Sequence, residues 1–593
     1  MNLKTTTLPT SQPTTNSSLL TRHPWLLAVL GAVLLWAGWP VNPGPAPLLL
    51  FVGFVPYLLL ERQLTAQGAS RRRVFGHTYL FLVLWNAFTT WWVSYSTLGG
   101  GIAAVVLNAL LMCLPLMAFR RTKARLGARW GYLPLPLYWI AFEQLHLHWD
   151  LTWPWLTLGN GFAAVPQWVQ WYEFTGFLGG SVWIWAVNLA VFFALVKSEK
   201  LKVKPANAGL PSGSAGRAGA AGSGLSGDDR AITNRPVLTF SSQLLTFLPP
   251  LLLITLPIAF SYLLGASYQE RGPAAEVLVI QPNVDPFEEK FKKGTRYIPP
   301  AEQLNRLLTR TEQNLTPQTR LVLWPETCLP DTQWEASFNQ DPRNQPIREL
   351  LARHPSLSLL TGATSIITYS TQDAASATAR YRDDLGYYDV FNSGVFLADA
   401  TTPAVFYHKS RLVPGVEKIP PLLTSVIKHI DLGGTVGSYG SQEARTVFPA
   451  LPSVPALRLS PIICYESVYG DFVSEYARNG ATLLGIITND GWWSDSPGYR
   501  QHLLYGALRA IETRRDIARS ANTGISGFIN QKGEITQRTG WWVGAASRGI
   551  VHLNDELTFY VRYGELLGRG AQVLAVLLLG LTIFNAKFKR SEN

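Results

Sequence analysis

Long apolar runs dominate the first half of the chain and return once near its end. Eight runs occur, at residues 24–39, 46–60, 78–95, 102–119, 133–147, 177–196, 244–264 and 571–584. A helix needs about 20 apolar residues to cross a bilayer, so the second, fifth and last runs are short for a span. We predict a membrane bundle of α-helices with about eight spans, seven within residues 24–272 and the last within residues 565–593.

From residue 276 the pattern changes to short β-rich apolar stretches that alternate with helices. We expect strands at residues 277–281, 321–324, 357–361, 390–397, 457–463, 483–488 and 525–529, and helices at residues 301–314, 471–478 and 499–514. This alternation is typical of an α/β domain. The sequence therefore predicts a second domain, outside the membrane, over residues 273–560.

Two segments have the composition of chain without fixed structure. Residues 1–23 are rich in Thr, Ser and Pro and lack the residue order of a cleaved signal peptide, so we expect a disordered tail. Residues 205–235 begin with a Gly, Ala and Ser rich stretch, which predicts a flexible linker inside the bundle. We expect the linker to take no part in chemistry.

The charge distribution predicts how the bundle is oriented. The formal net charge is +12, yet only 15% of residues are charged, and no nucleic-acid recognition motif occurs. Basic residues gather beside the apolar runs, at 62–73, 120–129, 197–204 and 587–590, whereas residues 39–46, 96–101 and 144–176 contain no Lys or Arg. Because basic loops stay in the cytoplasm, both termini are predicted to be cytoplasmic and the α/β domain to lie outside.

The cysteine and histidine content limits the chemistry. Cys113, Cys328 and Cys464 give an odd count and no disulfide framework. Cys113 lies in an apolar run and is expected in the core, whereas Cys328 could form an oxidised pair with Cys464. The nine histidines show no metal-ligand spacing. We therefore expect neither a metal nor a cofactor.

Three residues in order along the α/β domain suggest nucleophilic catalysis. Glu326 ends the run Trp324-Pro-Glu326, Lys409 follows His408, and Cys464 lies in Pro461-Ile-Ile-Cys-Tyr-Glu466. A cation lowers the pKa of a nearby thiol and a carboxylate can take its proton. Taken singly, a Cys is more often a small buried hydrophobe and a Glu or Lys is usually solvated surface. Glu326 and Cys464 both follow expected strands, however, where α/β enzymes place their chemistry.

These motifs resemble those of the carbon-nitrogen hydrolase (nitrilase) superfamily, and the membrane frame resembles that of apolipoprotein N-acyltransferases. Further matching stretches are Thr90-Trp-Trp-Val-Ser94, Trp153-Pro-Trp-Leu156, Tyr388-Asp-Val-Phe-Asn392, Thr488-Asn-Asp-Gly-Trp492, Gln501-His502 and Arg519-Ser-Ala-Asn-Thr-Gly524. The resemblance implies a four-layer αββα sandwich whose site faces lipid. In one departure, the family's usual Leu-Val-Pro-Phe-Gly-Glu loop reads Leu412-Val-Pro-Gly-Val-Glu417 here.

The resemblance also implies roles for individual residues. Cys464 is the expected nucleophile, Glu326 the general base, and Lys409 the group that stabilises the oxyanion and the thiolate. The other expected site residues are Glu417 and Glu466, which would position Lys409 or an incoming amine; Tyr465, Trp492 and Trp493, which would exclude water; and Asn392.

The implied reaction moves an acyl chain from a membrane phospholipid, through a Cys464 thioester, to the α-amine of the diacylglyceryl-cysteine of apolipoproteins. The implied setting is the bacterial inner membrane, with the catalytic domain periplasmic and the protein monomeric among membrane lipids. Three alternatives stay open: another acceptor such as a lipid-linked sugar, a membrane-tethered nitrilase-type amidase, and a transporter or receptor with a ligand-binding outer domain. Residues 419–432 form an amphipathic stretch that either enters the membrane interface or packs on the sandwich.

Overall fold

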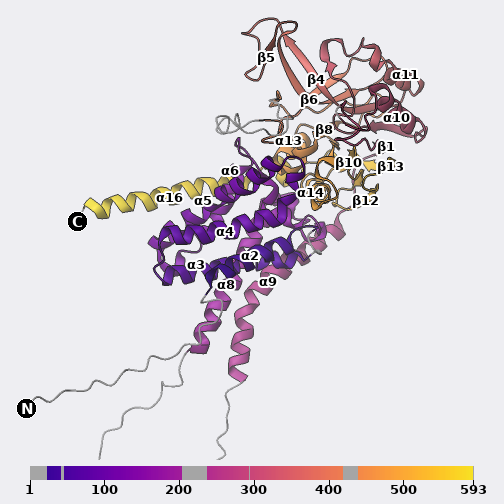
Figure 1. Cartoon of the computed structure of the whole chain (residues 1–593). Helices are drawn as coiled ribbons and strands as arrows, with labels where there is room; N and C mark the ends of the chain where they lie inside the picture. The colour runs from indigo at the N-terminus through magenta and orange to yellow at the C-terminus, as the bar shows by residue number, and fades with distance from the viewer. Residues whose placement is uncertain (1–22, 42–45, 204–236, 293, 419–438, 592–593) are drawn as a thin grey trace, which may run out of the picture.

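The computed structural model describes residues 23–41, 46–203, 237–292, 294–418 and 439–591 of the 593-residue chain. Residues 1–22 of the expected tail, the linker at residues 205–235 and the amphipathic stretch at residues 419–432 lie outside this part of the chain. Two bodies make up the rest, a helical bundle and a β-sandwich (Figure 1).

Every apolar run predicted as a span forms a helix. The helices of the bundle are α2 (Pro24–Gly38), α3 (Val55–Ala66), α4 (Arg71–Thr90), α5 (Leu98–Trp130), α6 (Pro134–His146), α8 (Leu178–Val203), α9 (Val237–Ser267) and α16 (Leu566–Ser591). Five stretches of the described chain are long and apolar enough to cross a membrane: Pro47–Ala66, Leu98–Gly127, Leu178–Glu199, Leu245–Ser267 and Leu566–Ile583. Helices α2, α4 and α6 are shorter or more polar, so the count of eight spans stays a prediction.

The basic end of α8 lies beside α3 and away from the sandwich. Arg62 of α3 pairs with Glu199 near the end of α8 at 2.8 Å, and that end of α8 points away from the sandwich (Figure 1). Lys123 of α5 is buried and donates to Glu61 of α3 and, over 2.6 Å, to the hydroxyl of Tyr132. The bundle thus contains a buried ion pair, because each charge finds its partner on the neighbouring helix.

Two β-sheets form the domain outside the bundle. The first has the order β13-β1-β2-β4-β6-β5, with β3 beside β4 and β7 beside β6, and the second has the order β12-β11-β10-β9-β8. The strands are β1 (Ala274–Gln281), β2 (Thr319–Leu323), β3 (Gln333–Trp334), β4 (Ser358–Tyr369), β5 (Arg380–Arg382), β6 (Gly386–Leu397), β7 (Val405–His408), β8 (Leu459–Ile463), β9 (Leu483–Thr488), β10 (Asp516–Ala521), β11 (Gly527–Ile529), β12 (Ile535–Arg538) and β13 (Ala545–His552).

The two sheets pack face to face and helices cover their outer faces. A Cβ at Gly394 of β6 would lie 3.2 Å from Pro461 of β8, so the sheets approach closely at this point. Helices α10 (Pro300–Glu312) and α11 (Gln345–Arg353) share an apolar cluster with the first sheet, and α13 (Gly470–Arg478) and α14 (Pro497–Thr513) pack on the second. The predicted four-layer αββα sandwich is confirmed.

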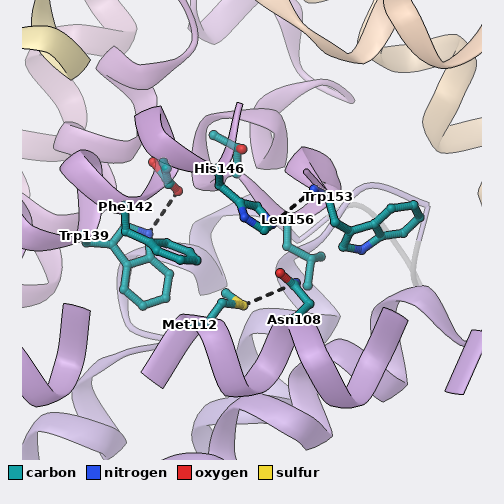
Figure 2. Close-up of a pocket in the computed structure, with 9 residues that line it drawn as sticks. Asn108, Met112, Trp139, Phe142, His146, Trp153 and Leu156 are labelled. Carbon is teal, nitrogen blue, oxygen red and sulfur yellow. Dashed lines mark hydrogen bonds between the residues drawn. The ribbon is translucent and has the colours of Figure 1, made fainter. Parts of the chain in front are cut away.

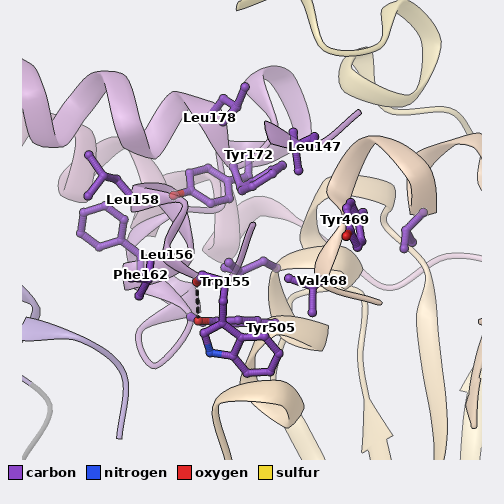
Figure 3. Packing of buried hydrophobic residues seen from close by; sticks show 14 of the residues in the cluster. Leu147, Trp155, Leu156, Leu158, Phe162, Tyr172, Leu178, Val468, Tyr469 and Tyr505 are labelled. Carbon is purple, nitrogen blue, oxygen red and sulfur yellow. Dashed lines mark hydrogen bonds between the residues drawn. The ribbon is translucent and has the colours of Figure 1, made fainter. Parts of the chain in front are cut away.

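Helix α14 also belongs to the interface with the bundle. Trp155 donates its indole N–H to Gln501 over 2.7 Å, and the Tyr505 hydroxyl donates to the Trp155 carbonyl over 3.0 Å. Figure 3 shows Trp155 and Leu158 of the bundle in one apolar cluster with Val468 of the sandwich. The bundle and the sandwich therefore share one continuous apolar core beside Gln501 and Tyr505 of α14.

Candidate active site

The predicted catalytic residues meet where strands of both sheets end. Glu326 follows β2, Lys409 follows β7 and Cys464 follows β8. Their exposed fractions are 6%, 1% and 7%, so all three side chains are withdrawn from solvent. The Cys464 thiol interacts electrostatically with both other residues. The sequence placed Glu326 and Cys464 at strand ends, whereas the strand before Lys409 was not predicted, and the two-sheet fold brings all three residues together.

The Glu326 carboxylate is fixed by three donors. Its Oε1 accepts from the Asn392 side-chain amide over 2.8 Å and from Lys409 over 3.2 Å. Its Oε2 accepts from the main-chain N–H of Asn489 over 3.0 Å. A carboxylate held in this way has its orientation set before a substrate arrives, as a general base requires.

Lys409 is buried between two carboxylates. Its ammonium donates to Glu417 over 2.9 Å as well as to Glu326. Burial lowers the pKa of Lys409, but the charges of Glu326, Glu417 and Cys464 outweigh burial and raise it well above its usual value. The residue is therefore a fixed cation, suited to stabilise a developing oxyanion.

The loop that departs from the family pattern delivers Glu417 to this cation. Gly415 has a φ of 81°, a left-handed conformation that glycine adopts without a steric cost. Glu417 then accepts from the main-chain N–H of Val413 over 2.8 Å and from Asn392 over 2.9 Å. The loop has Gly415-Val416 where the usual pattern has Phe-Gly. Glu417 nevertheless makes the expected contact with Lys409.

Cys464 begins a short helical turn, Cys464–Val468, directly after β8. Its φ is 50°, so the nucleophile lies on a sharp and strained strand-to-helix turn. Burial, and then the charge of Glu326, raise the pKa of the Cys464 thiol well above its usual range, while Lys409 acts in the opposite direction. The resting thiol therefore keeps its proton, and attack requires a base that removes it.

Glu466 supports the main chain on both sides of the site. Its Oε1 accepts from the Tyr407 hydroxyl over 2.6 Å and from the N–H of Ser410 over 2.7 Å, and its Oε2 accepts from the N–H of Ile463 over 2.8 Å. It thereby links the residues that flank Lys409 to those that flank Cys464. The structure gives Glu466 no direct hydrogen bond to Lys409 among the described contacts.

The aromatic residues expected at the site lie between the sandwich and the bundle. Tyr465 donates to the carbonyl of Thr152 over 3.3 Å and stacks on Trp153. Trp493 packs edge-on against Trp155 at 5.7 Å between ring centres. Trp492 contacts Phe287 at 5.1 Å, and its carbonyl accepts from Ser96 over 3.4 Å. Through these contacts, residues beside Cys464 and after Asp490 pack against the bundle.

Cys464, Asp490 and His502 lie close enough to hold a metal ion, with one ligand atom from each within 4.8 Å of the others. Asp490 already accepts from Thr488 over 2.8 Å and from Arg519 over 2.6 Å. Both nitrogens of His502 also have hydrogen-bond partners within the protein. The donor set is therefore committed to a network of hydrogen bonds, and it does not fit an open metal site.

All three cysteines are described and all are free thiols. Cys113 is buried in the bundle core, as expected. Cys328 Sγ lies 3.2 Å from the Thr361 hydroxyl and lines a small cavity beside Glu326 together with Lys290. Burial lowers the pKa of Lys290 to about 8.

A second pocket lies within the bundle near the sandwich. Figure 2 shows its lining, which consists of Asn108, Met112, Trp139, Phe142, Glu143, His146, Trp153, Leu156 and Thr157. One carboxylate oxygen of Glu143 accepts from Trp139 over 2.9 Å and from the N–H of Leu158 over 2.8 Å. These bonds tie Glu143 to the packing of the fold.

Sequence reasoning gave no role to four residues that the structure places at the site. Asn489 holds Glu326, and Asp490, His502 and Arg519 form a buried chain behind Cys464. All four fall in stretches that match the family. The sequence did contain a signal for them. A polar residue within an apolar stretch that is expected to be buried needs a hydrogen-bond partner.

Comparison with known proteins agrees with these features. Residues 30–190 match the family model of the apolipoprotein N-acyltransferase N-terminal domain, and residues 299–550 match that of carbon-nitrogen hydrolase. An apolipoprotein N-acyltransferase of Chlorobaculum tepidum is 28% identical over 561 residues, covering 93% of this chain and 94% of that protein. Another, from Geobacter metallireducens, is 26% identical over 572 residues, covering 94% and 95%.

Among solved structures, a nitrilase-superfamily protein of Saccharomyces cerevisiae matches 49% of this chain and 95% of its own, with a TM-score of 0.33 and 15% identity. The resemblance to apolipoprotein N-acyltransferases and to the nitrilase superfamily is confirmed by the family matches and the relatives.

Proposed function

We propose that this chain, which joins an apolipoprotein N-acyltransferase N-terminal domain to a carbon-nitrogen hydrolase domain, is a membrane-bound N-acyltransferase of lipoproteins. The observation that carries the proposal is the buried set of Glu326, Lys409 and Cys464 on a sandwich attached to an apolar helical bundle. Relatives named apolipoprotein N-acyltransferase align with more than nine-tenths of the chain and support the same acceptor class.

The first half-reaction loads the enzyme. Cys464 Sγ attacks the carbonyl carbon of a phospholipid ester while Glu326 takes the thiol proton, which the raised thiol pKa makes necessary. Lys409 stabilises the negative oxygen of the tetrahedral intermediate. The ester C–O bond then breaks, Glu326 returns the proton to the leaving oxygen, and a lysophospholipid departs from a Cys464 thioester.

The second half-reaction transfers the acyl chain. The α-amine of a lipoprotein's diacylglyceryl-cysteine attacks the thioester carbon, and Glu326 accepts a proton from that amine. Lys409 again stabilises the oxyanion. The C–S bond breaks, the sulfur of Cys464 regains its proton from Glu326, and an amide forms on the lipoprotein.

Burial of the site supports transfer over hydrolysis. A thioester that meets water is hydrolysed, which would waste the acyl chain. The low exposure of Cys464 and the aromatic contacts of Trp492 and Trp493 with neighbouring rings favour exclusion of water.

We propose further that the sandwich lies on the periplasmic side of the inner membrane, with both termini cytoplasmic. Support comes from the Lys and Arg residues that follow Arg62 and Lys197, because basic loops stay in the cytoplasm and this end of α8 points away from the sandwich. A membrane-impermeant maleimide applied to spheroplasts should label Cys464 and should miss a cysteine placed in the linker by Ser212→Cys. The opposite labelling would reject this orientation.

Acyl transfer can be tested on the full-length protein purified in detergent. Incubation with phospholipid should add the mass of one acyl chain to the peptide that contains Cys464. Addition of a diacylglyceryl-cysteine peptide should remove that mass and yield an N-acylated peptide. A protein that leaves phospholipid intact but hydrolyses soluble amides would be an amidase, and the proposal would be wrong.

A loaded enzyme that passes its acyl chain to a lipid-linked sugar, and not to the lipopeptide, would keep the thioester step and reject the acceptor. Mass spectrometry of both acceptors in one reaction distinguishes these outcomes. Omission of the phospholipid is the matched control, because neither product then has an acyl source.

A further inference from the structure

The last helix of the bundle, α16, begins directly after a turn that is surrounded by arginines. The short helix α15 (Phe559–Tyr563) ends at Gly564, whose φ of 74° is left-handed, and α16 begins two residues later. Figure 1 shows α16 running from this junction away from the sandwich. The turn therefore lies where the apolar bundle meets the domain outside it.

Two guanidinium groups approach the same point of this turn. A Cβ built on Gly564 would lie 3.0 Å from Nη2 of Arg569 and 3.4 Å from Nη2 of Arg478. Arg569 lies near the start of α16, whereas Arg478 ends α13 and donates its Nε–H to the Val561 carbonyl over 2.7 Å. Two like charges at this separation repel each other, and an anion bound between them removes that repulsion.

The described part of the chain supplies no such anion. Arg478, Arg562 of α15 and Arg569 are all exposed, and none of them forms an ion pair with a described acidic residue. The acid next to the turn, Glu565, is buried, and one of its oxygens accepts from the N–H of Gly568 over 3.3 Å. The three guanidinium groups are therefore open to a ligand from outside the chain.

The surroundings of these arginines are those of a membrane interface. Phe559, Tyr563 and Leu566 have exposed fractions of 47%, 52% and 51%. The stretch Leu566–Ile583 is long and apolar enough to cross a membrane. Exposed aromatic rings at the start of a span are typical of the headgroup layer. The guanidinium groups beside them thus lie at the level of the lipid phosphates.

The arginines also run against the charge distribution of the outer loops. In the proposed topology this junction lies outside, where residues 39–46, 96–101 and 144–176 contain no Lys or Arg. The rule that keeps basic loops in the cytoplasm therefore does not explain Arg562 and Arg569. A bound anion explains their position.

We propose that Arg478, Arg562 and Arg569 form a phosphate site that binds a membrane phospholipid at the start of α16. A guanidinium presents parallel N–H donors that match two phosphate oxygens. The exposed side chains of Val573 and Leu577 give the acyl chains an apolar surface, which a free phosphate would not use.

This lipid is a structural ligand that holds the sandwich against the membrane, and it is separate from the acyl donor. Cys464 precedes α13 and Arg478 ends it, so about the length of that helix separates the phosphate site from the nucleophile.

Binding is measured by titration of the full-length protein in detergent, followed by native mass spectrometry. The probe is a dialkyl phosphatidylglycerol, whose ether-linked chains contain no ester carbonyl that Cys464 could attack. The dialkylglycerol with the same chains and no phosphate is the matched lipid control. The variants are Arg569→Gln and the double variant Arg478→Gln, Arg569→Gln. Arg538→Gln, an exposed arginine on β12, is the control variant.

We expect the tightest binding of the probe to weaken about tenfold or more in the double variant, because charge-assisted hydrogen bonds to the phosphate are lost. Arg569→Gln should weaken it less, and Arg538→Gln should not change it. The dialkylglycerol should bind equally to all these proteins. Unchanged affinity for the probe in the double variant overturns the proposal. If the double variant fails to fold, unchanged affinity in Arg569→Gln does the same.

Inorganic phosphate distinguishes a lipid site from a site for a free anion. At a concentration equal to that of the probe it should leave the probe bound, because it has no chains to contact α16. Displacement at equal concentration would reject the lipid as the occupant.

The titration involves no acyl transfer, so its failure and that of the proposed function are distinguishable. A protein that binds the probe as expected but transfers no acyl chain would reject only the proposed function. One that transfers acyl chains but binds the probe equally well in every variant would reject only the phosphate site.

Discussion

Asn489 donates its main-chain N–H to Oε2 of Glu326 over 3.0 Å, on the side of the carboxylate away from Lys409. One oxygen is thus held by the main chain while the other faces the cation. The main-chain donor on one oxygen complements the side-chain donors Asn392 and Lys409 on the other, and together they fix the carboxylate plane. This arrangement makes Glu326 suited to exchange protons with two different partners in turn.

We therefore expect Glu326→Gln to slow both half-reactions, by about 10²-fold to 10⁴-fold, because the amide cannot take up a proton. Thioester formation is followed by mass spectrometry after mixing with phospholipid, and thioester consumption after slow loading and addition of lipopeptide. Glu312→Gln, on the outer face of the sandwich, is the matched control. Normal consumption of the thioester by the Glu326 variant would show that the base acts in the first step alone.

Cys464→Ala should abolish the acyl-enzyme and leave the protein folded, since the change removes one sulfur atom from a supported turn. Intact-mass measurement after incubation with phospholipid checks the first point, and a thermal melt in detergent checks the second. Cys113→Ala, in the bundle core, should still form the thioester. An acyl adduct on the Cys464 variant would assign the nucleophile elsewhere.

Lys409→Ala should slow thioester formation by about 10²-fold or more, through loss of oxyanion stabilisation. It should also destabilise the fold by about 3–5 kcal/mol, because Glu326 and Glu417 then share a buried site without their cation. Lys409→Arg should rescue little, since a planar guanidinium does not fit a site shaped for a compact ammonium.

Stability and single-turnover rate are measured separately for these two variants. Arg306→Ala removes an exposed ion pair with Glu302 and should change the melting temperature little. Full activity in the arginine variant would mean that the site needs a positive charge but not the shape of lysine.

The effect of Asp490→Asn should depend on pH. The folded-state pKa of Asp490 is about 2, below its ordinary value of 3.8. A lowered pKa contributes stability that is present above pH 4 and is lost as the pH falls toward 2; its size is about 2 kcal/mol. The melting-temperature difference between wild type and variant should therefore be largest near neutral pH and shrink below pH 4.

Scanning fluorimetry in detergent across that range makes the comparison, with Asp384→Asn on the surface as the control. A difference that stays constant down to pH 2.5 would show that Asp490 stabilises the fold by shape and not by charge.

Gly415→Ala tests the loop that departs from the family pattern. The position has open space for a methyl group but a φ of 81°, so the cost of about 1 kcal/mol arises from the backbone. We expect slower thioester formation as Glu417 moves away from Lys409. Gly570→Ala on α16 also has open space but no left-handed φ, and should leave the rate unchanged. Equal rates for the two variants would show that the loop tolerates a side chain.

The sequence predicted the parts of this protein that depend on local pattern. All eight apolar runs are helices, and the strands before Glu326 and Cys464 lie within a few residues of their expected positions. Motif order then sufficed to name the residues that meet at the site. Such elements can be predicted because their hydrophobic periodicity depends only on residues that are close along the chain.

Features that depend on tertiary contacts were missed. Strands β10 and β13 were not expected, since Arg519 on β10 and Arg548 on β13 interrupt the apolar pattern. Arg519 is tolerated in a buried strand because Asp490 lies opposite it. The contacts of His502 were likewise not predicted, because they join three separate segments, α14 and the short helices η9 (Cys464–Val468) and η10 (Asp490–Trp493).

Helix α14 has a consequence for attempts to isolate the catalytic domain. Gln501 and Tyr505 on this helix hold Trp155 of the bundle, while His502, between them, holds the carbonyl of Cys464. A water-soluble fragment cut at residue 273 would expose the apolar side of α14 and release two of its anchors. The carbonyl of Cys464 would then be held by a helix that has lost its contacts with the bundle. The catalytic domain therefore needs the membrane bundle to keep its nucleophile in place.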